Sequence, residues 1–277
     1  MTIYDLCCGS GSFGLSLLGA LPPAPYAGGK TRLLRQIHAH VEARLGAVPA
    51  PGQAVFLDRG EWARTLSALQ QHGADVAAAL RAWAPENDRG LFDRLRSYPP
   101  AQHPAVRAAT HLYLQTRTYR AKPVYPTDTG WVTHGFDPEF RPNKNPGPNT
   151  HPRGLFLPRH ALAERAEMTT RALQGEHKIL QADVRNFTPS EPGLVYFDPN
   201  YTRSADLPMV DRNQVRYLHE VTRAEAVACV QRWRDAGSIV VYSQGERVDI
   251  PGFYAVQLRV PGQRTFALRE EWLMISQ

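Results

Sequence analysis

Cysteine is scarce in this sequence of 277 residues, which has three, Cys7, Cys8 and Cys229. Three cysteines are too few for a disulfide framework, and the adjacent pair is typical of small packing residues beside a turn. No apolar stretch approaches the length of a membrane span, and the first residues lack the basic start of a signal peptide. These absences predict a reduced, cytoplasmic protein with no membrane partner.

Metal-ligand spacing is also missing. Structural and catalytic metal sites need histidines grouped with cysteines or carboxylates at short, regular intervals. The histidines show no such grouping, so we expect solvated or packing roles for them and no metal: His38, His40, His103, His111 and His134. The sequence has no internal repeat and no low-complexity tail.

The composition that is present is ordinary for a soluble globular protein. Hydrophobic residues make up 43% of the chain and charged residues 21%, and 277 residues can bury a full α/β core beside a smaller module. The formal net charge is +6. That charge is compatible with a polyanionic partner but does not identify one, because many basic proteins never bind nucleic acid.

Strand-like and helix-like segments alternate along the chain. The expected strands are residues 3–6, 54–57, 178–181, 194–197, 238–242, 253–260 and 271–276. The expected helices are residues 13–18, 33–45 ended by Gly46, a stretch around 62–69, 76–83 capped by Asp75, 104–119, 158–173, and one opened by the capping box at 222–225 and ended by Gly237. This alternation predicts a mainly parallel sheet with a late hairpin at its edge.

Residues 121–154 differ from the rest of the chain. They contain seven prolines and four glycines and show no sustained hydrophobic period. A long irregular stretch in a compact protein is usually a functional loop or a disordered one.

A glycine-rich turn follows the first expected strand, in the pattern Asp5-x-x-x-Gly9-x-Gly11 with Gly14 further on. Such a turn brings the backbone close to a nucleotide-type ligand, a dinucleotide included. Two acids favour S-adenosylmethionine. Asp5 can hold an ammonium group through a water or a backbone amide, and Asp58, at the end of the next strand, can accept hydrogen bonds from ribose hydroxyls. The alternative is a tight strand–helix turn with a surface acid.

The tetrad Asp198-Pro199-Asn200-Tyr201 ends the apolar run at residues 194–197. An exocyclic nucleobase amine is a poor nucleophile because its lone pair is delocalised into the ring. Two acceptors, the Asp198 carboxylate and the Pro199 carbonyl, can hold both N–H groups and favour a tetrahedral nitrogen, so that catalysis is mainly positioning and electrostatics. Tyr201 can stack on a base that has left the duplex. The alternative is an ordinary turn, in which Asp-Pro and Asn are common.

With these motifs, the chain resembles the D12 class of DNA adenine-N6 methyltransferases, the group that includes the Dam enzymes, over most of its length. Residues 5–14 look like the family's cofactor loop, and residues 26–34 look like its GGK segment. Residues 108–120 resemble the helix and turn that lead into target recognition. Asp183, within residues 183–187, matches the acid that binds the cofactor's adenine amine, and residues 196–201 match the catalytic strand. The resemblance implies the catalytic residues Asp198, Pro199, Asn200 and Tyr201. It implies these cofactor residues: Tyr26, Gly28, Gly29, Lys30, Asp5, Cys7, Gly9, Gly11, Phe13, Asp58, Asp183 and Val184.

Two features depart from the family pattern. The GGK segment usually precedes the glycine loop and here follows it, as if the first strand had moved ahead of the GGK helix with the sheet unchanged. The third tetrad residue is usually proline and here is Asn200, which replaces a stiff apolar residue by a flexible one with a donor and an acceptor. Slower turnover, altered base choice and loss of activity are the consequences we consider.

Cations and aromatic rings are interleaved in the region between the two halves of the expected sheet. Cations can bind phosphates, arginine can read guanine edges and a ring can enter the gap left by a flipped base. The DNA-binding residues that we predict are Arg117, Tyr119, Arg120, Lys122, Arg141, Lys144 and Arg203. For any single residue the alternative is a solvated loop whose aromatic rings pack on the core.

The sequence thus predicts an α/β protein with a Rossmann-like S-adenosylmethionine-dependent methyltransferase sheet. Residues 1–60 and 160–277 would form the catalytic domain, and 61–159 a mainly helical and loop target-recognition insertion. The implied activity is methylation of adenine N6 in double-stranded DNA at a short sequence, by a monomer or weak dimer, with a restriction endonuclease as a partner that the resemblance allows. The alternatives are cytosine-N4 methylation, methylation of RNA or a protein amide, and a DNA-binding relative that has lost turnover.

Overall fold

The computed structural model describes residues 1–6, 11–24, 31, 33–47, 52–83, 88–118, 123–136, 159–199, 221–259 and 271–277. Two compact units divide the chain: residues 1–21, 30–63 and 172–277 form the first, and residues 22–29 and 64–171 the second. The second unit includes residues 160–171, which the sequence analysis assigned to the catalytic part, because the helix that contains them packs on other helices of that unit.

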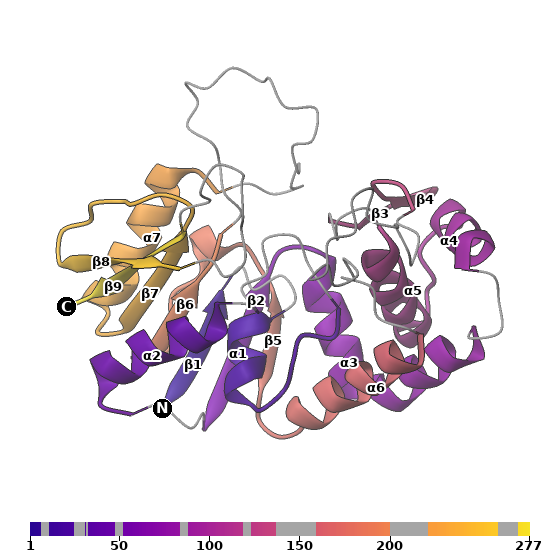
Figure 1. The fold of residues 1–277 in the computed structure, drawn as a ribbon, viewed down its shortest axis with the longest axis horizontal. Coiled ribbons are helices and arrows are strands. Elements are labelled where there is room, and N and C mark those ends of the chain that lie inside the picture. The colour runs from indigo at the N-terminus through magenta and orange to yellow at the C-terminus, as the bar shows by residue number, and fades with distance from the viewer. Residues whose placement is uncertain are drawn as a thin grey trace, which may run out of the picture. The chain divides into compact units, whose positions relative to one another are not determined.

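The first unit is built on a seven-stranded sheet with the order β5-β2-β1-β6-β7-β9-β8 (Figure 1). Its strands are β1 (Thr2–Leu6), β2 (Gln53–Asp58), β5 (Lys178–Gln181), β6 (Leu194–Phe197), β7 (Ile239–Gln244), β8 (Phe253–Leu258) and β9 (Glu271–Ser276). The pairs from β5 to β7 are parallel, and β9 is antiparallel to both β7 and β8. The mainly parallel sheet and its late edge hairpin are therefore confirmed, and the order is compatible with a Rossmann-like fold.

Helices cover both faces of this sheet because alternate strand residues point to opposite sides. On one face, α1 (Ser12–Leu17) and α2 (Leu34–Leu45) bury a cluster that includes Ile3, Phe13, Ile37, Val41, Leu194 and Tyr196. On the other, α7 (Arg223–Asp235) buries a cluster that includes Tyr4, Leu6, Val195, Phe197, Val230 and Trp233. The sheet is a middle layer whose faces are both covered, as parallel strands require.

The helix ends in this unit follow the predicted signals. Gly46 has a left-handed backbone with φ 78° directly after α2, and Gly237 has φ 87° just beyond α7. Thr222 and Glu225 form the predicted capping box at the start of α7. These local signals are confirmed.

The second unit is mainly helical. It contains most of α3 (Glu61–Ala82), with α4 (Asp88–Ser97), α5 (Pro104–Arg117), the hairpin strands β3 (Tyr125–Thr127) and β4 (Gly130–Val132), and nearly all of α6 (Arg159–Ala172). Neither α4 nor the hairpin was predicted. The predicted helix start at Asp75 is wrong, because α3 runs through that residue and is kinked at His72.

A close contact between α3 and α6 accompanies the kink. The Thr170 hydroxyl donates to the Leu69 carbonyl at 3.0 Å, and a Cβ added to Gly73 would lie 1.9 Å from that hydroxyl oxygen. The contact therefore needs glycine at this position. Over the described part of the chain, no helix is both long enough and apolar enough to cross a membrane.

A candidate ligand site at the carboxyl edge of the sheet

Four neighbouring strands of the sheet each carry an aspartate at or near their carboxyl end. Asp58 is the last residue of β2, Asp5 is the penultimate residue of β1, Asp198 directly follows β6, and Asp183 lies two residues after β5. Because β5, β2, β1 and β6 are adjacent and parallel, these four residues share one edge of the sheet. In open α/β sheets, ligands bind outside this edge.

The strand ends that precede the glycine turn and the tetrad lie side by side. Leu6 is the register partner of Phe197, and the backbone N–H of Asp198 donates to the Leu6 carbonyl at 3.3 Å. The strand order reverses between β1 and β6, because β2 and β5 lie on one side of β1 while β6 and β7 lie on the other. Such a reversal is the usual position of a ligand crevice in this kind of sheet.

Asp5 is almost fully buried, with 1% of its surface exposed. Its Oδ2 accepts a hydrogen bond from the backbone N–H of Gly14 at 2.7 Å. Burial raises the pKa of Asp5 from 3.8 to about 8; the Gly14 hydrogen bond opposes the shift, and the charges of Asp198 and Asp58 add to it. Asp5 therefore acts through the backbone of the turn, and its carboxyl group lies within electrostatic reach of the other two acids.

The two described glycines of the turn serve packing and backbone shape. Gly11 has φ 69°, a left-handed conformation that favours glycine, at the start of α1. A Cβ on Gly14 would lie 2.6 Å from the Phe56 ring and 3.1 Å from Asp5 Oδ2. From the sequence, we explained these glycines by close approach of the backbone to a ligand. The structure gives Gly14 a different reason, since a side chain there would separate α1 from β2 and from the Asp5 carboxylate.

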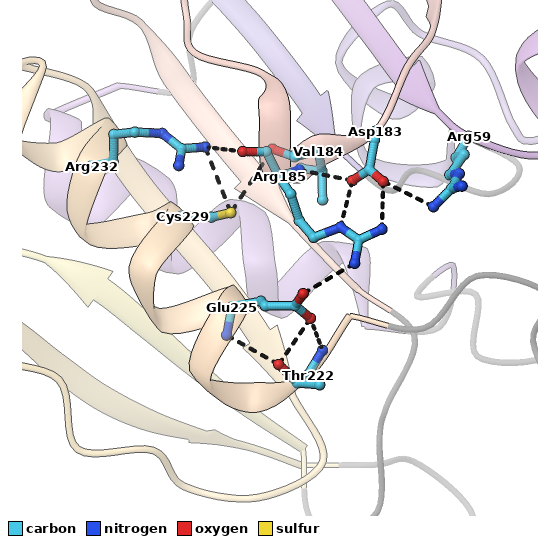
Figure 2. Close-up of polar contacts among 8 residues, drawn as sticks. All are labelled: Arg59, Asp183, Val184, Arg185, Thr222, Glu225, Cys229 and Arg232. Carbon is cyan, nitrogen blue, oxygen red and sulfur yellow. Dashed lines mark hydrogen bonds and ion pairs between the residues drawn. The ribbon is translucent and has the colours of Figure 1, made fainter.

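The Asp183 carboxylate is held by two arginines, as Figure 2 shows. Oδ1 accepts from the backbone N–H of Arg185 at 3.0 Å and from its Nε at 2.9 Å. Oδ2 accepts from Arg185 Nη2 at 2.6 Å and from Arg59 Nη1 at 2.9 Å. The Arg185 side chain is the main cause that lowers the pKa of Asp183 to about 2. The residue predicted to bind an adenine amine is thus an anion with four donors on it.

Arg185 also joins this edge of the sheet to α7. Its Nη1 donates to Glu225 Oε1 at 3.0 Å, and Glu225 Oε2 accepts from the backbone N–H of Thr222 at 2.8 Å (Figure 2). Arg232 donates to the Arg185 carbonyl at 3.1 Å. Sequence reasoning missed Arg59 and Arg185. Their positions in the sequence could have indicated this role, since Arg59 directly follows Asp58 and Arg185 lies two residues after Asp183.

The remaining described site residues lie in different surroundings. Asp58 is half-buried, and its Oδ1 accepts from the Gly60 N–H at 2.6 Å. Asp198 is half-buried and Pro199 is buried. Phe13 and Val184, which we predicted as cofactor contacts, are in the hydrophobic core; the Phe13 ring stacks on Tyr196 with centroids 4.3 Å apart. The Phe13 ring thus supports β6, and the cofactor contacts of Phe13 and Val184 stay predictions.

Arg117 requires a correction. We predicted it as a DNA contact, but its side chain is fully buried in the second unit, with its guanidinium 5.3 Å from the centre of the Tyr113 ring. A phosphate contact needs an exposed cation, so Arg117 does not have the predicted role in this structure.

Many predicted residues lie outside the described part of the chain. For the cofactor site these are Tyr26, Gly28, Gly29, Lys30, Cys7 and Gly9; for catalysis, Asn200 and Tyr201; for DNA binding, Tyr119, Arg120, Lys122, Arg141, Lys144 and Arg203. Their roles stay predictions.

The described residues contain no group of three or more histidine, cysteine or acidic side chains positioned to hold a metal ion. In comparisons with known proteins, no family model matches the sequence, and no curated protein matches it.

Proposed function

We propose that this protein is an S-adenosylmethionine-dependent methyltransferase that acts on adenine N6 in double-stranded DNA at a short sequence. The observation that carries the proposal is the adjacency of the two strand ends that lead into the glycine turn and the tetrad, where the Asp198 N–H donates to the Leu6 carbonyl at 3.3 Å. A methyl donor held at the first and an amine held at the second would lie on one edge of the sheet, at the reversal of strand order.

The charge of this edge suits a cationic methyl donor. Asp58 and Asp198 are half-buried acids whose charges both act on the pKa of the buried Asp5, so the two lie at the same part of this edge, where a positive ligand would be favoured. Asp58, at the end of β2, is the acceptor for ribose hydroxyls, and the Gly14 amide, fixed by Asp5, shapes the turn around the ligand.

Asp198 and Pro199 would hold the target amine. When bound, S-adenosylmethionine supplies a methyl group on a sulfonium, and the S–C bond breaks as the N–C bond forms. The Asp198 carboxylate and the Pro199 carbonyl accept the two amine N–H groups and direct the nitrogen lone pair toward the methyl carbon. Asp198 then passes to solvent the proton that the nitrogen loses. Most of the rate would come from this positioning.

The nucleic-acid assignment depends on the D12 resemblance, on the net charge of +6 and on the basic, aromatic character of residues 117–159. The second unit would then carry target recognition. Cytosine N4 presents the same kind of amine to the tetrad, so the base is decided by experiment.

The test is to incubate the purified protein with S-adenosylmethionine and unmethylated double-stranded DNA, and then to analyse the nucleosides by mass spectrometry. We expect N6-methyladenine, dependent on the protein and on the cofactor. N4-methylcytosine alone would contradict the adenine assignment, and the absence of any methylated nucleoside would contradict the activity.

A further inference from the structure

The carboxylate of Asp183 has no acceptor position to spare. An ionised carboxylate offers about four acceptor positions. Three are used by the backbone N–H, Nε and Nη2 of Arg185, and the fourth by Nη1 of Arg59. A ligand amine can therefore bond Asp183 only if one of these four contacts gives way.

The two arginines hold Asp183 very differently. Arg185 makes three of the contacts and lies only two residues after Asp183 in the chain. The remaining nitrogen of its guanidinium, Nη1, donates to Glu225 Oε1 at 3.0 Å, which fixes the group further. Arg59 makes one contact at 2.9 Å, comes from the end of the neighbouring strand β2 and keeps 47% of its side chain exposed. The Arg59 contact is the weaker of the two, because an exposed single ion pair contributes little in water.

We propose that Arg59 occupies the acceptor position on Asp183 that the adenine amine of S-adenosylmethionine takes when the cofactor binds. The amine then displaces Arg59 from Asp183, while Arg185 keeps the carboxylate oriented. This inference rests on the proposed cofactor. Arg59 is then a specificity-determining residue: its ion pair favours ligands whose amine replaces the lost donor, and it disfavours ligands that would leave the carboxylate with one donor fewer.

The test measures the affinity of S-adenosylhomocysteine by calorimetry for the wild type and for Arg59→Ala. Without its competitor, Asp183 should bind the ligand roughly two- to fivefold more tightly. Arg185→Ala should change affinity in the opposite direction, since it releases the carboxylate from its fixed orientation. The gain from Arg59→Ala should shrink at about 0.5 M NaCl, where the wild-type ion pair is already screened.

Two controls separate this effect from a change in folding. Arg81→Ala removes a matched exposed ion pair with Glu167, in which the arginine side chain is 51% exposed, and should leave affinity unchanged. In an Asp183→Asn background, Arg59→Ala should not increase the affinity for S-adenosylhomocysteine, because the carboxylate for which Arg59 competes is gone. Arg59→Met, which keeps much of the side-chain length but has no N–H donor, serves if thermal unfolding shows that the alanine variant is not folded.

The outcomes distinguish the two proposals. Unchanged or weaker binding by Arg59→Ala, with measurable wild-type binding, would overturn the exchange and leave the methyltransferase proposal standing. No wild-type binding of either S-adenosylmethionine or S-adenosylhomocysteine would overturn both.

Discussion

Asp5 and Asp183 lie at the same edge of the sheet, yet their pKa values are shifted in opposite directions. Asp5 is surrounded by the core and by two other acids, and its pKa is raised to about 8. Asp183 faces two guanidinium groups, and its pKa is lowered to about 2. Both residues were predicted as cofactor ligands from their positions in the sequence, but only their surroundings decide which of them is charged at neutral pH.

The shifted pKa of Asp5 predicts a pH-dependent gain in stability for Asp5→Asn. The folded protein keeps a proton on Asp5 that the unfolded chain releases above pH 3.8, so the contribution of Asp5 to stability falls as pH rises from 3.8 to about 8. Asparagine has no such dependence and can still accept from Gly14. The free energy of unfolding in urea should therefore exceed that of the wild type by an amount that grows over this range and reaches more than about 1 kcal/mol near its upper end.

A difference between Asp5→Asn and the wild type that is the same at every pH would contradict this interpretation. It would mean that Asp5 keeps an ordinary pKa in the folded protein.

Gly14→Ala should destabilise the first unit by about 1–3 kcal/mol, because the new Cβ would lie 2.6 Å from the Phe56 ring. Urea unfolding measures this cost, and Phe56→Leu in the same chain should recover part of it. Gly52→Ala is the matched control, since its Cβ would lie 3.9 Å from the Met1 nitrogen, an ordinary contact distance. Equal effects at Gly14 and Gly52 would show that the close packing of α1 on β2 is not the reason for Gly14.

At the scale of elements, α7 is tied to the carboxyl edge through its first turn. The Thr222 hydroxyl accepts from the Glu225 N–H at 3.2 Å, and Glu225 reaches Arg185. Thr222→Ala should lower the free energy of unfolding by about 1 kcal/mol. Thr222→Ser should lower it much less, because the capping oxygen remains. If both variants unfolded at the same urea concentration as the wild type, the capping box would not contribute to stability.

The elements that sequence patterns predicted best are those with strong local signals. Residues 178–181, 194–197 and 271–276 are strands with the predicted bounds, since each is a short apolar or β-favouring run between turns. The kink in α3 could not be predicted, because it accompanies the contact of Thr170 with Leu69 from another helix. The hairpin at 125–132 was hidden within a segment rich in proline and glycine.

The grouping of acids at the candidate site was predictable from the sequence, because the end of a strand fixes where the residues near it lie. Asp58, Asp183 and Asp198 were each placed after a predicted strand and Asp5 near the end of one, and a parallel sheet brings such positions to one edge. The ion pairs of Asp183 were not predictable, because Arg59 reaches it from another strand 124 residues away in the chain. Burial of Arg117 was equally hidden, since a charged residue at the end of a helix is usually exposed.

At the scale of the whole molecule, the net charge of +6 is the feature that bears on the partner. If several phosphates are neutralised on binding, the logarithm of the DNA association constant should fall against the logarithm of salt concentration with a slope of roughly −3 or steeper. Fluorescence anisotropy with a labelled duplex measures this slope. A flat response would contradict a basic DNA-binding surface.

The most direct measurement of the central claim is single-turnover methyl transfer to duplex DNA by the wild type and by Asp198→Ala, with S-adenosylmethionine affinity measured on the same samples. Asp198 directly follows β6, beside the turn that would hold the methyl donor. We predict that the variant loses transfer by at least about a hundredfold while its cofactor affinity stays within a few fold of the wild type. Undiminished transfer by Asp198→Ala would contradict the account.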